Sequence, residues 1–410
     1  MDISKDTFIT MVERMASFGS APDEGCSIFG VGYEDAFVRI EHKYLNEQFT
    51  RGTSSEKFVI GPFGSGKTHF LRQLMEIARD RNCVTSEVVL NKDIDFSRSI
   101  IVYSEVIREL RVPFSRERGI KHFLSASLEK VKSCSENKYI EELFVNGWIS
   151  GIDKKGFKLD MFGKVIKKAL MAIVEEDDVI LDMCCRWIEG DINDRRLSGE
   201  LGIAQIDKSS NNLYAKRLMM SLFQFIRHAG FQGSLVCFDE AEQGLSVDKK
   251  KTDKILSMLM SGIESITNLQ EGSALVVYAL TPDLVDKMKN FAALQQRIMS
   301  PRGRGFFDGN TLAPLIELWS DNPLEDIRRI GNKLADVFYE LLGEQISIRK
   351  EEVYKEINEI AISIVEENIS GSSRREMVKA TCSMLLELFE TGKLVKPELF
   401  KEDSFDEPEV

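Results

Sequence analysis

Eight consecutive residues have the spacing of a loop that wraps around phosphate groups. Glycines let successive backbone N–H groups turn toward phosphate oxygens, and the N-terminus of a following helix adds the positive end of its dipole. We therefore expect this loop to bind ATP, with the Lys67 amine at the β- and γ-phosphates and the Thr68 hydroxyl on Mg²⁺. The loop is a full G-x-x-x-x-G-K-[ST] match, and with the next histidine it forms the predicted cofactor site: Gly61-Pro62-Phe63-Gly64-Ser65-Gly66-Lys67-Thr68-His69.

Two acids follow the apolar run 235–238, at the point where a strand would end. The carboxyl ends of parallel strands meet at one edge of a sheet, so we expect these acids to lie beside the phosphate loop. Asp239 would hold Mg²⁺, and Glu240 would polarise the attacking water. A solvated turn would explain an isolated Asp-Glu pair equally well, but the phosphate loop favours the catalytic interpretation. Glu242, a third acid nearby, is interpreted as structural.

A polar residue ends the next apolar run, Ala274–Leu280. At this strand tip, Thr281 could hydrogen-bond the attacking water or the γ-phosphate, and we assign it to the catalytic set. The sequence Thr281-Pro282-Asp283 also fits the start of a helix, with threonine as the N-cap and proline in the first position. The two roles are compatible with each other.

Arg297 completes the candidate catalytic residues, which also include Lys67, and Arg374 completes the candidate cofactor-binding residues. Arg297 ends a helical stretch, and in a multimeric ATPase it could reach the γ-phosphate of a neighbouring subunit, with Arg302 and Arg304 as alternatives. Arg374, at the start of the last predicted helix, could fold back onto the bound nucleotide. For each of these arginines, an ordinary solvated surface charge is the competing interpretation.

The elements that must position these residues follow from the periodicity of apolar side chains. We expect an α/β fold: a parallel sheet core that carries the phosphate loop, a long helical insertion and a C-terminal helical lid. Short apolar runs predict strands at 58–60, 84–90, 235–238 and 274–280, with a weaker signal at 312–318. Helices are expected at 33–48 and 67–81, through most of 94–230, and at 324–342, 351–367 and 373–389.

These elements divide the chain into five predicted parts, which accords with a length too great for one ordinary core. The first and third parts together form the core that the helical insertion interrupts. The parts are an N-terminal segment with the first half of the core (1–93), the insertion (94–230), the second half of the core (231–320), the lid (321–395) and an acidic tail (396–410).

The composition excludes several classes of protein. Of the 410 residues, 43% are hydrophobic and 29% are charged, which fits a folded chain and not a disordered one. The net charge of −12 argues against a surface coated with positive charge for nucleic acid. We find no signal peptide and no apolar run of the roughly 20 residues that span a bilayer, and therefore expect a cytoplasmic protein without membrane contact. Seven scattered cysteines predict reduced thiols.

In this order, the motifs resemble those of AAA+ P-loop ATPases, in particular the branch that contains initiator and origin-recognition proteins. Residues 294–302 are similar to the L-x-x-R-[VI]-x-S-x-R pattern of that branch, and residues 371–374 to its G-x-x-R lid motif. Residues 29–34 are similar to the segment that contacts adenine in such proteins. The resemblance implies that Thr281 is a first sensor, Arg297 an arginine finger and Arg374 a second sensor.

A narrower resemblance is to the ATP-binding proteins of bacterial BREX-type and related anti-phage defence systems. It is carried by the long insertion and by residues 31–33, 58–71, 195–202 and 233–242. It implies a Mg²⁺-dependent ATPase, converting ATP to ADP and phosphate, that couples nucleotide state to assembly or remodelling of a defence complex. We expect homo-oligomers, defence-system partners such as a helicase or nuclease, or both. The protein could also bind DNA. We expect such binding not to be sequence-specific, because no winged helix follows the predicted lid.

The sequence leaves one main alternative, a nucleotide-gated scaffold that binds ATP and recruits a helicase or nuclease with little hydrolysis. The pair Asp239 and Glu240 favours hydrolysis but does not set its rate. A small-molecule P-loop kinase is a third interpretation, and it leaves Arg297 and Arg374 unexplained.

Overall fold

The computed structural model describes residues 3–91, 94, 98–134, 141–241, 249–289, 292–298, 305–320, 322–367 and 373–397. The chain divides into two compact units, each assembled from segments that are distant in sequence. We call them the sheet unit (Asp35–Ile60 and Ile77–Glu317) and the loop–bundle unit (Met1–Glu34, Gly61–Glu76 and Leu318–Val410).

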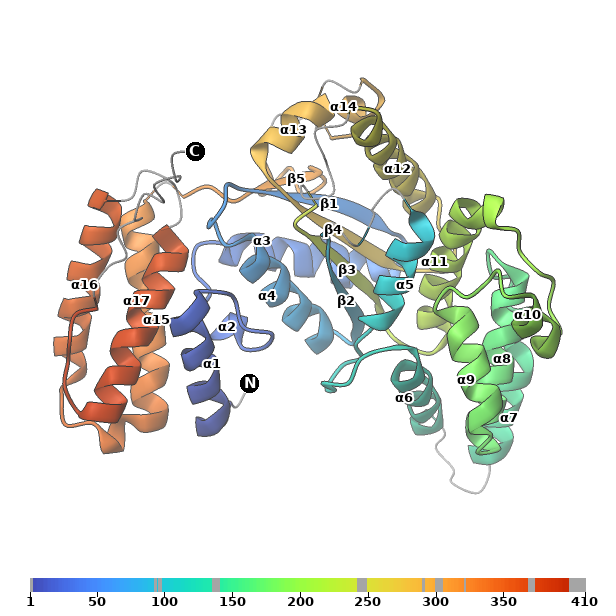
Figure 1. Ribbon diagram of the computed structural model, residues 1–410, viewed down its shortest axis with the longest axis horizontal. Helices are drawn as coiled ribbons and strands as arrows, with labels where there is room; N and C mark the ends of the chain where they lie inside the picture. Colours follow the sequence, from blue (N-terminus) through green and yellow to red (C-terminus); the bar gives the residue numbers. More distant parts are fainter. Residues whose placement is uncertain are drawn as a thin grey trace, which may run out of the picture. The chain divides into compact units, whose positions relative to one another are not determined.

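Among the described residues, a parallel sheet of five strands in the order β2-β3-β4-β1-β5 forms the centre of the sheet unit (Figure 1). Strands β3 and β4 are buried along their whole length, which is why their sequences are continuous apolar runs. The predicted α/β fold with a parallel sheet is confirmed, and each predicted strand is present. The strands are β1 (Ser55–Ile60), β2 (Cys83–Val89), β3 (Gly233–Asp239), β4 (Ala274–Leu280) and β5 (Leu315–Glu317).

All paired strands of this sheet run in the same direction, so their carboxyl ends lie along one edge. The register places Tyr278 of β4 opposite both Phe58 of β1 and Phe238 of β3. The three rings stack across the sheet, with centroids 5.5 Å apart for Phe58 and Tyr278 and 5.0 Å apart for Phe238 and Tyr278. This stack helps to fix the register of the three strands whose ends carry predicted site residues.

Helices pack on the strands of the sheet unit. Helix α5 (Ser99–Arg108) packs on β2, α11 (Asn211–His228) on β3, and α12 (Lys249–Thr267) on β1. Helix α3 (Glu34–Ile40) continues directly into the π-helical segment η1 (Glu41–Gln48). Together these two elements match the helix predicted at 33–48. After β4 the chain forms α13 (Pro282–Lys289) and α14 (Ala292–Ile298).

The segment between β2 and β3 is mainly helical, as predicted for 94–230 (Figure 1). It shares one hydrophobic core with the sheet. Helix α8 shows the pattern that drives this packing, because Phe162, Ile166 and Leu170 recur at a spacing of four and are fully buried. The remaining helices are α6 (Ile120–Ser133), α7 (Glu141–Gly151), α8 (Asp160–Val174), α9 (Asp178–Ile188) and α10 (Arg195–Leu201), with 3₁₀ turns η2 (Ile152–Lys154) and η3 (Lys208–Ser210).

A helical bundle fills most of the loop–bundle unit. Its C-terminal helices α15 (Pro323–Leu342), α16 (Lys350–Glu367) and α17 (Ser373–Thr391) match the three that the sequence predicts, with a 3₁₀ turn η4 (Gly343–Gln345) after the first. A further helix, α1 (Lys5–Phe18), packs along α17 (Figure 1) and was not predicted. Its buried residues Phe8, Met11, Val12 and Met15 share one hydrophobic core with the C-terminal helices.

The helix after the phosphate loop, α4 (Lys67–Asp80), is tied to the start of the chain by polar contacts. The Glu76 carboxylate, 2% exposed, accepts hydrogen bonds from the backbone N–H groups of Cys26 and Ser27, each at 2.9 Å. These two residues begin the short helix α2 (Cys26–Phe29), so Glu76 caps α2 from a distant position in the sequence. The Arg72 guanidinium donates to the Ala21 carbonyl at 2.5 Å and reinforces the connection.

Two further properties concern the chain as a whole. In the part of the chain that the structure describes, no helix is long and apolar enough to cross a bilayer. All seven cysteines are free thiols, and all except Cys134 are buried.

Candidate nucleotide site

The phosphate loop connects β1 to α4, and its glycines are required by its backbone. Gly64 and Gly66 have φ values of +76° and +92°, in the left-handed region that residues with a Cβ rarely adopt. At Gly61 the constraint is space, because a Cβ there would lie 2.3 Å from the Ser65 Oγ. The loop therefore has a conformation that suits a backbone cradle for an anion.

The Lys67 side chain folds back over this loop and is largely buried. Its Nζ donates to the carbonyl oxygens of Gly61, at 2.9 Å, and Pro62, at 3.1 Å. The same atom lies 5.2 Å from the centroid of the Phe63 ring. These contacts hold the ammonium group on the loop, which is where the motif requires a positive charge.

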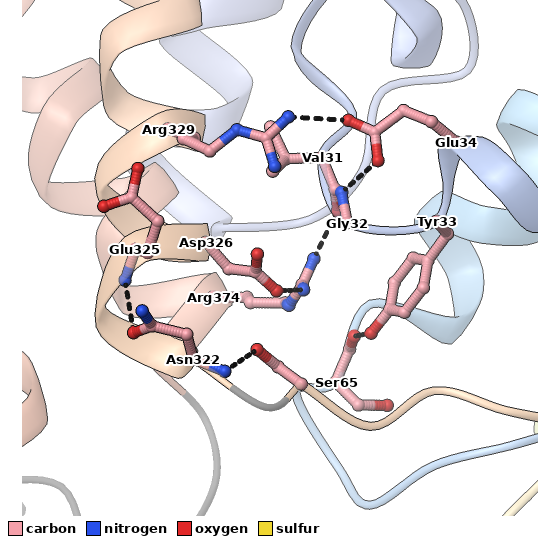
Figure 2. A network of polar contacts seen from close by, with 11 residues as sticks. Val31, Gly32, Tyr33, Glu34, Ser65, Asn322, Glu325, Asp326, Arg329 and Arg374 are labelled. Atoms are coloured by element: carbon pink, nitrogen blue, oxygen red, sulfur yellow. Dashed lines mark hydrogen bonds and ion pairs between the residues drawn. The ribbon is translucent and has the colours of Figure 1, made fainter.

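Arg374, from the first turn of α17, lies beside the same loop. Its Cδ is 3.8 Å from the position that a Cβ on Gly66 would occupy. Its Nη1 donates to the Val31 carbonyl at 2.9 Å, and its Nη2 forms an ion pair with Asp326 of α15 (Figure 2). The guanidinium carbon is 4.7 Å from the centroid of the Tyr33 ring, a cation–π distance. One arginine thus contacts the bundle and the segment around Val31 while it lies next to the loop.

Tyr33 connects that segment to the loop itself. Its hydroxyl donates to the Ser65 carbonyl at 3.4 Å (Figure 2). Its ring packs edge-on against Phe70 of α4 with centroids 5.8 Å apart. Burial raises the pKa of the Tyr33 hydroxyl, so this group stays protonated and remains a donor. The segment that resembles an adenine-contacting sequence therefore lies against the phosphate loop.

Glu34 fastens the other end of the segment to α15. Its carboxylate accepts from the Gly32 N–H at 2.8 Å and pairs with Arg329 at 3.0 Å. Partial burial raises the pKa of Glu34, but the hydrogen bonds from the Glu34 and Gly32 N–H groups and the charge of Arg329 outweigh it, so the pKa is lowered. Glu34 is therefore ionised at neutral pH, as this ion pair requires.

In the sheet unit, the two predicted acids stand at the carboxyl end of β3. Asp239 is 2% exposed and is the last residue of the strand. Glu240 follows with a φ of +54°, and its N–H donates to the Asp239 Oδ1 at 2.9 Å. A left-handed φ in a residue other than glycine costs about 1–2 kcal/mol, and such strain is concentrated at functional sites.

The strand ends of the sheet unit align along one edge. Strand β4 lies between β3 and β1, with Ile60 opposite Leu280. Neighbouring strands are about 4.8 Å apart, so Asp239 at the end of β3 is two strand spacings from β1, the strand that leads into the phosphate loop. Thr281 follows β4 and is buried, and its carbonyl accepts from the Leu284 N–H at 3.2 Å. Thr281 thus occupies the N-cap position of α13, one of the two roles expected of it.

The family model of the BREX system ATP-binding protein BrxC/D matches residues 3–403 of this sequence. The chain belongs to this family. Comparisons with curated proteins and with solved structures find no match. The resemblance to BREX-type ATP-binding proteins is therefore confirmed over nearly the whole chain, including the helical insertion, and the family supports ATP as the ligand.

In this member of the BREX family, His69 lies behind the loop. Its ring packs on Phe29 with centroids 4.8 Å apart, and its buried Nε2 has no hydrogen-bond partner among the described residues. Burial, followed by the nearby charge of Arg374, lowers the pKa of His69 to about 4. The imidazole is therefore neutral at pH 7 and offers no positive charge to a phosphate, so a cofactor role for His69 stays a prediction.

Arg297 lies on α14 and is exposed. Its guanidinium pairs with Glu264 of α12 at 2.5 Å, so within one chain it forms a surface ion pair of the sheet unit. Its role as an arginine finger remains a prediction. The alternatives Arg302 and Arg304 lie outside the described residues, as do Glu242 and residues 371–372 of the lid motif.

Two acids that pair with arginines in this BREX protein were not predicted from the sequence. Asp326 and Glu34 were not singled out, although they pair with Arg374 and Arg329. Asp326 is in the first turn of α15, where an acid is expected simply because it complements the helix dipole. The sequence therefore contains no separate signal for its contact with an arginine on α17.

Proposed function

We propose that this chain is a Mg²⁺-dependent ATPase that couples its nucleotide state to assembly or remodelling of a BREX defence complex. The observation that carries the proposal is the position of Arg374 next to Gly66, in a loop whose left-handed glycines suit phosphate binding. A second cation, Lys67, is held on the same loop. Two cations around such a loop fit a polyphosphate, and membership of an ATP-binding family supports ATP.

The oxygen groups at the predicted metal positions suit Mg²⁺. Thr68 supplies a hydroxyl in the first turn of α4, and Asp239 supplies a largely buried carboxylate at the end of β3. Hard oxygen ligands of this kind are those that Mg²⁺ prefers, together with phosphate oxygens and water. When bound, Mg²⁺ would neutralise charge that develops on the β- and γ-phosphate oxygens.

Each remaining residue has one proposed task. Lys67 exchanges the carbonyls of Gly61 and Pro62 for β- and γ-phosphate oxygens, since its Nζ has three donors that can reorient. Glu240 polarises the attacking water, and Thr281 orients that water or the γ-phosphate. Hydrolysis of ATP depends mainly on such positioning and on charge neutralisation, which these residue types provide.

Two substitutions test the proposal. Lys67→Ala should abolish binding of a fluorescent ATP analogue, whereas Glu240→Gln should bind it and lose turnover by about 100-fold or more. Glu175→Gln, which removes an exposed acid after α8, is the control and should match the wild type in both assays. Wild-type turnover in Glu240→Gln would contradict the role given to this residue, and unchanged binding in Lys67→Ala would contradict the nucleotide site.

Arg297 would act on the nucleotide of an adjacent subunit, and its ion pair with Glu264 also supports the second candidate function. In the second candidate function, a nucleotide-gated scaffold that hydrolyses slowly and recruits a helicase or nuclease, Arg297 keeps this surface pair and contacts no nucleotide. Turnover measured over a range of protein concentrations, with and without DNA, separates the two. A steep rise with concentration that Arg297→Ala removes supports the shared site, and a low, flat rate supports the scaffold.

A further inference from the structure

The partner of Arg374 is a carboxylate that is largely shielded from water. The side chains of Arg374 and Asp326 are each only 15% exposed. Exposed ion pairs contribute little to stability because water and salt screen them, and shielding of this degree strengthens the attraction. Although Arg374 lies beside the phosphate loop, its terminal nitrogens are therefore held by Val31 and Asp326 (Figure 2).

The backbone is shaped around this ion pair. Gly32 has a φ of +95°, and a Cβ there would lie 2.9 Å from both the Arg374 Nη2 and the Asp326 Oδ2. Any side chain at this position would collide with both members of the pair. The segment that carries Val31 and Tyr33 can pass over the pair only because residue 32 is glycine.

Asp326 is held in place by a well-capped helix. The Asn322 side chain accepts from the Glu325 N–H at 3.2 Å, and the Asp326 N–H donates to the Asn322 carbonyl at 3.1 Å. Pro323 occupies the first turn, where its fixed φ favours the helix start. The carboxylate is thus presented by a regular element, and its position does not depend on a loop.

A guanidinium group grips a phosphate best through two parallel N–H donors. In Arg374, the Nη1 donates to Val31 and the Nη2 to Asp326, so two of its five N–H donors are engaged and its charge is already paired with a carboxylate. Asp326 is the anionic partner of the two. It is therefore the group that competes most directly with an anionic ligand for the charge of Arg374.

We propose that Asp326 is a built-in competitor of the nucleotide, and that Arg374 exchanges the Asp326 carboxylate for the γ-phosphate when ATP binds. The inference rests on the proposed function, because it takes Arg374 to be a phosphate ligand. ADP has no γ-phosphate, so the exchange is specific to ATP. The strength of the Arg374–Asp326 pair then sets how strongly the site prefers ATP to ADP, and breaking it frees the first turn of α15 only in the ATP state.

Asp326→Asn tests the exchange, since it removes the charge and keeps the shape of the side chain. Dissociation constants for fluorescent ATP and ADP analogues are measured in the wild type, Asp326→Asn, Arg374→Ala and the double variant. For Asp326→Asn, ATP should bind about tenfold tighter, whereas ADP should change by less than about twofold. In the Arg374→Ala background the same substitution should have no effect on ATP, because there is then no arginine to release.

Glu325→Gln is the matched control, because it removes an acid from the same helical turn that pairs with Arg328 instead. It should leave both dissociation constants unchanged. Unchanged or weaker ATP binding in Asp326→Asn overturns the proposal, and so does tighter binding that persists without Arg374. If thermal denaturation shows that Asp326→Asn is unfolded, Asp326→Ser is judged by the same criteria. If Lys67→Ala still binds ATP, the proposed function itself is refuted. If Lys67→Ala loses ATP binding but Asp326→Asn leaves ATP binding unchanged, only the exchange is refuted.

Discussion

A buried glutamate in β1 should make the sheet unit less stable as the pH rises. Both carboxylate oxygens of Glu56 are buried, and neither has a hydrogen-bond partner among the described residues. The Oε1 lies 3.4 Å from the position that a Cβ on Gly262 of α12 would occupy, and the Tyr278 hydroxyl of β4 lies 3.9 Å from the same position. Burial raises the pKa of Glu56 well above its ordinary value, because the charged form loses its hydration.

The sign and size of the effect follow from proton binding. Between the unfolded-state pKa of about 4.3 and the raised folded-state pKa, the folded state keeps the Glu56 proton, whereas the unfolded chain has lost it. The contribution of Glu56 to stability is therefore full below that pH and declines as the pH rises toward the folded-state pKa. The free energy of unfolding should fall by up to about 1.4 kcal/mol per pH unit in this window.

Urea unfolding at pH 5 and pH 7 measures this decline, followed by the fluorescence of Trp148 and Trp187 in the sheet unit. Glu56→Gln keeps the size of the side chain and removes its titrating proton, so its stability should fall less than that of the wild type between pH 5 and pH 7. Glu175→Gln, an exposed acid on the same unit, should behave as the wild type does. Parallel pH dependence in the wild type and Glu56→Gln would refute the assignment of a protonated Glu56.

Two further predictions concern the loop–bundle unit. Gly66→Ala must hold alanine at a φ of +92°, so it should cost about 1–2 kcal/mol in thermal denaturation and weaken ATP binding. Gly52→Ala, in the turn before β1 of the sheet unit, imposes a similar φ of +70° and should leave ATP affinity intact. An equal loss of ATP affinity in both variants would contradict the special role of Gly66. Phe8→Ala removes a fully buried ring and should cost about 3–5 kcal/mol in urea unfolding. Phe18→Ala on the same helix, where the ring is 73% exposed, should cost much less, and a similar cost would show that α1 does not pack in the bundle.

The sheet was predictable because its signals are local. Strand β4 is an apolar run bounded by turn residues, and the predicted range 274–280 is the observed one. The phosphate loop was equally predictable, because its motif implies backbone φ values that require glycine. In both cases, residues within a few positions of each other determine the structure.

The parts that escaped prediction depend on contacts between distant segments. Helix α1 has its own N-cap and a buried face, but its partner α17 lies at the other end of the sequence. Likewise Glu76 caps α2, and Asp326 meets Arg374, across long separations. The local sequence around an acid in a helix is the same whether the acid faces solvent or an arginine. Its sequence neighbours therefore cannot identify its partner.

The order of synthesis gives the three-segment loop–bundle unit a particular folding history. Helix α1 is synthesised long before α17, so the apolar face of α1 lacks this partner while the residues between the two helices are made. At about 5–20 residues per second this delay is on the order of tens of seconds, far longer than a helix needs to form. Until α17 emerges, Phe8, Met11 and Met15 lack the core that they share with it, and Arg374 is not yet available to lie beside the phosphate loop.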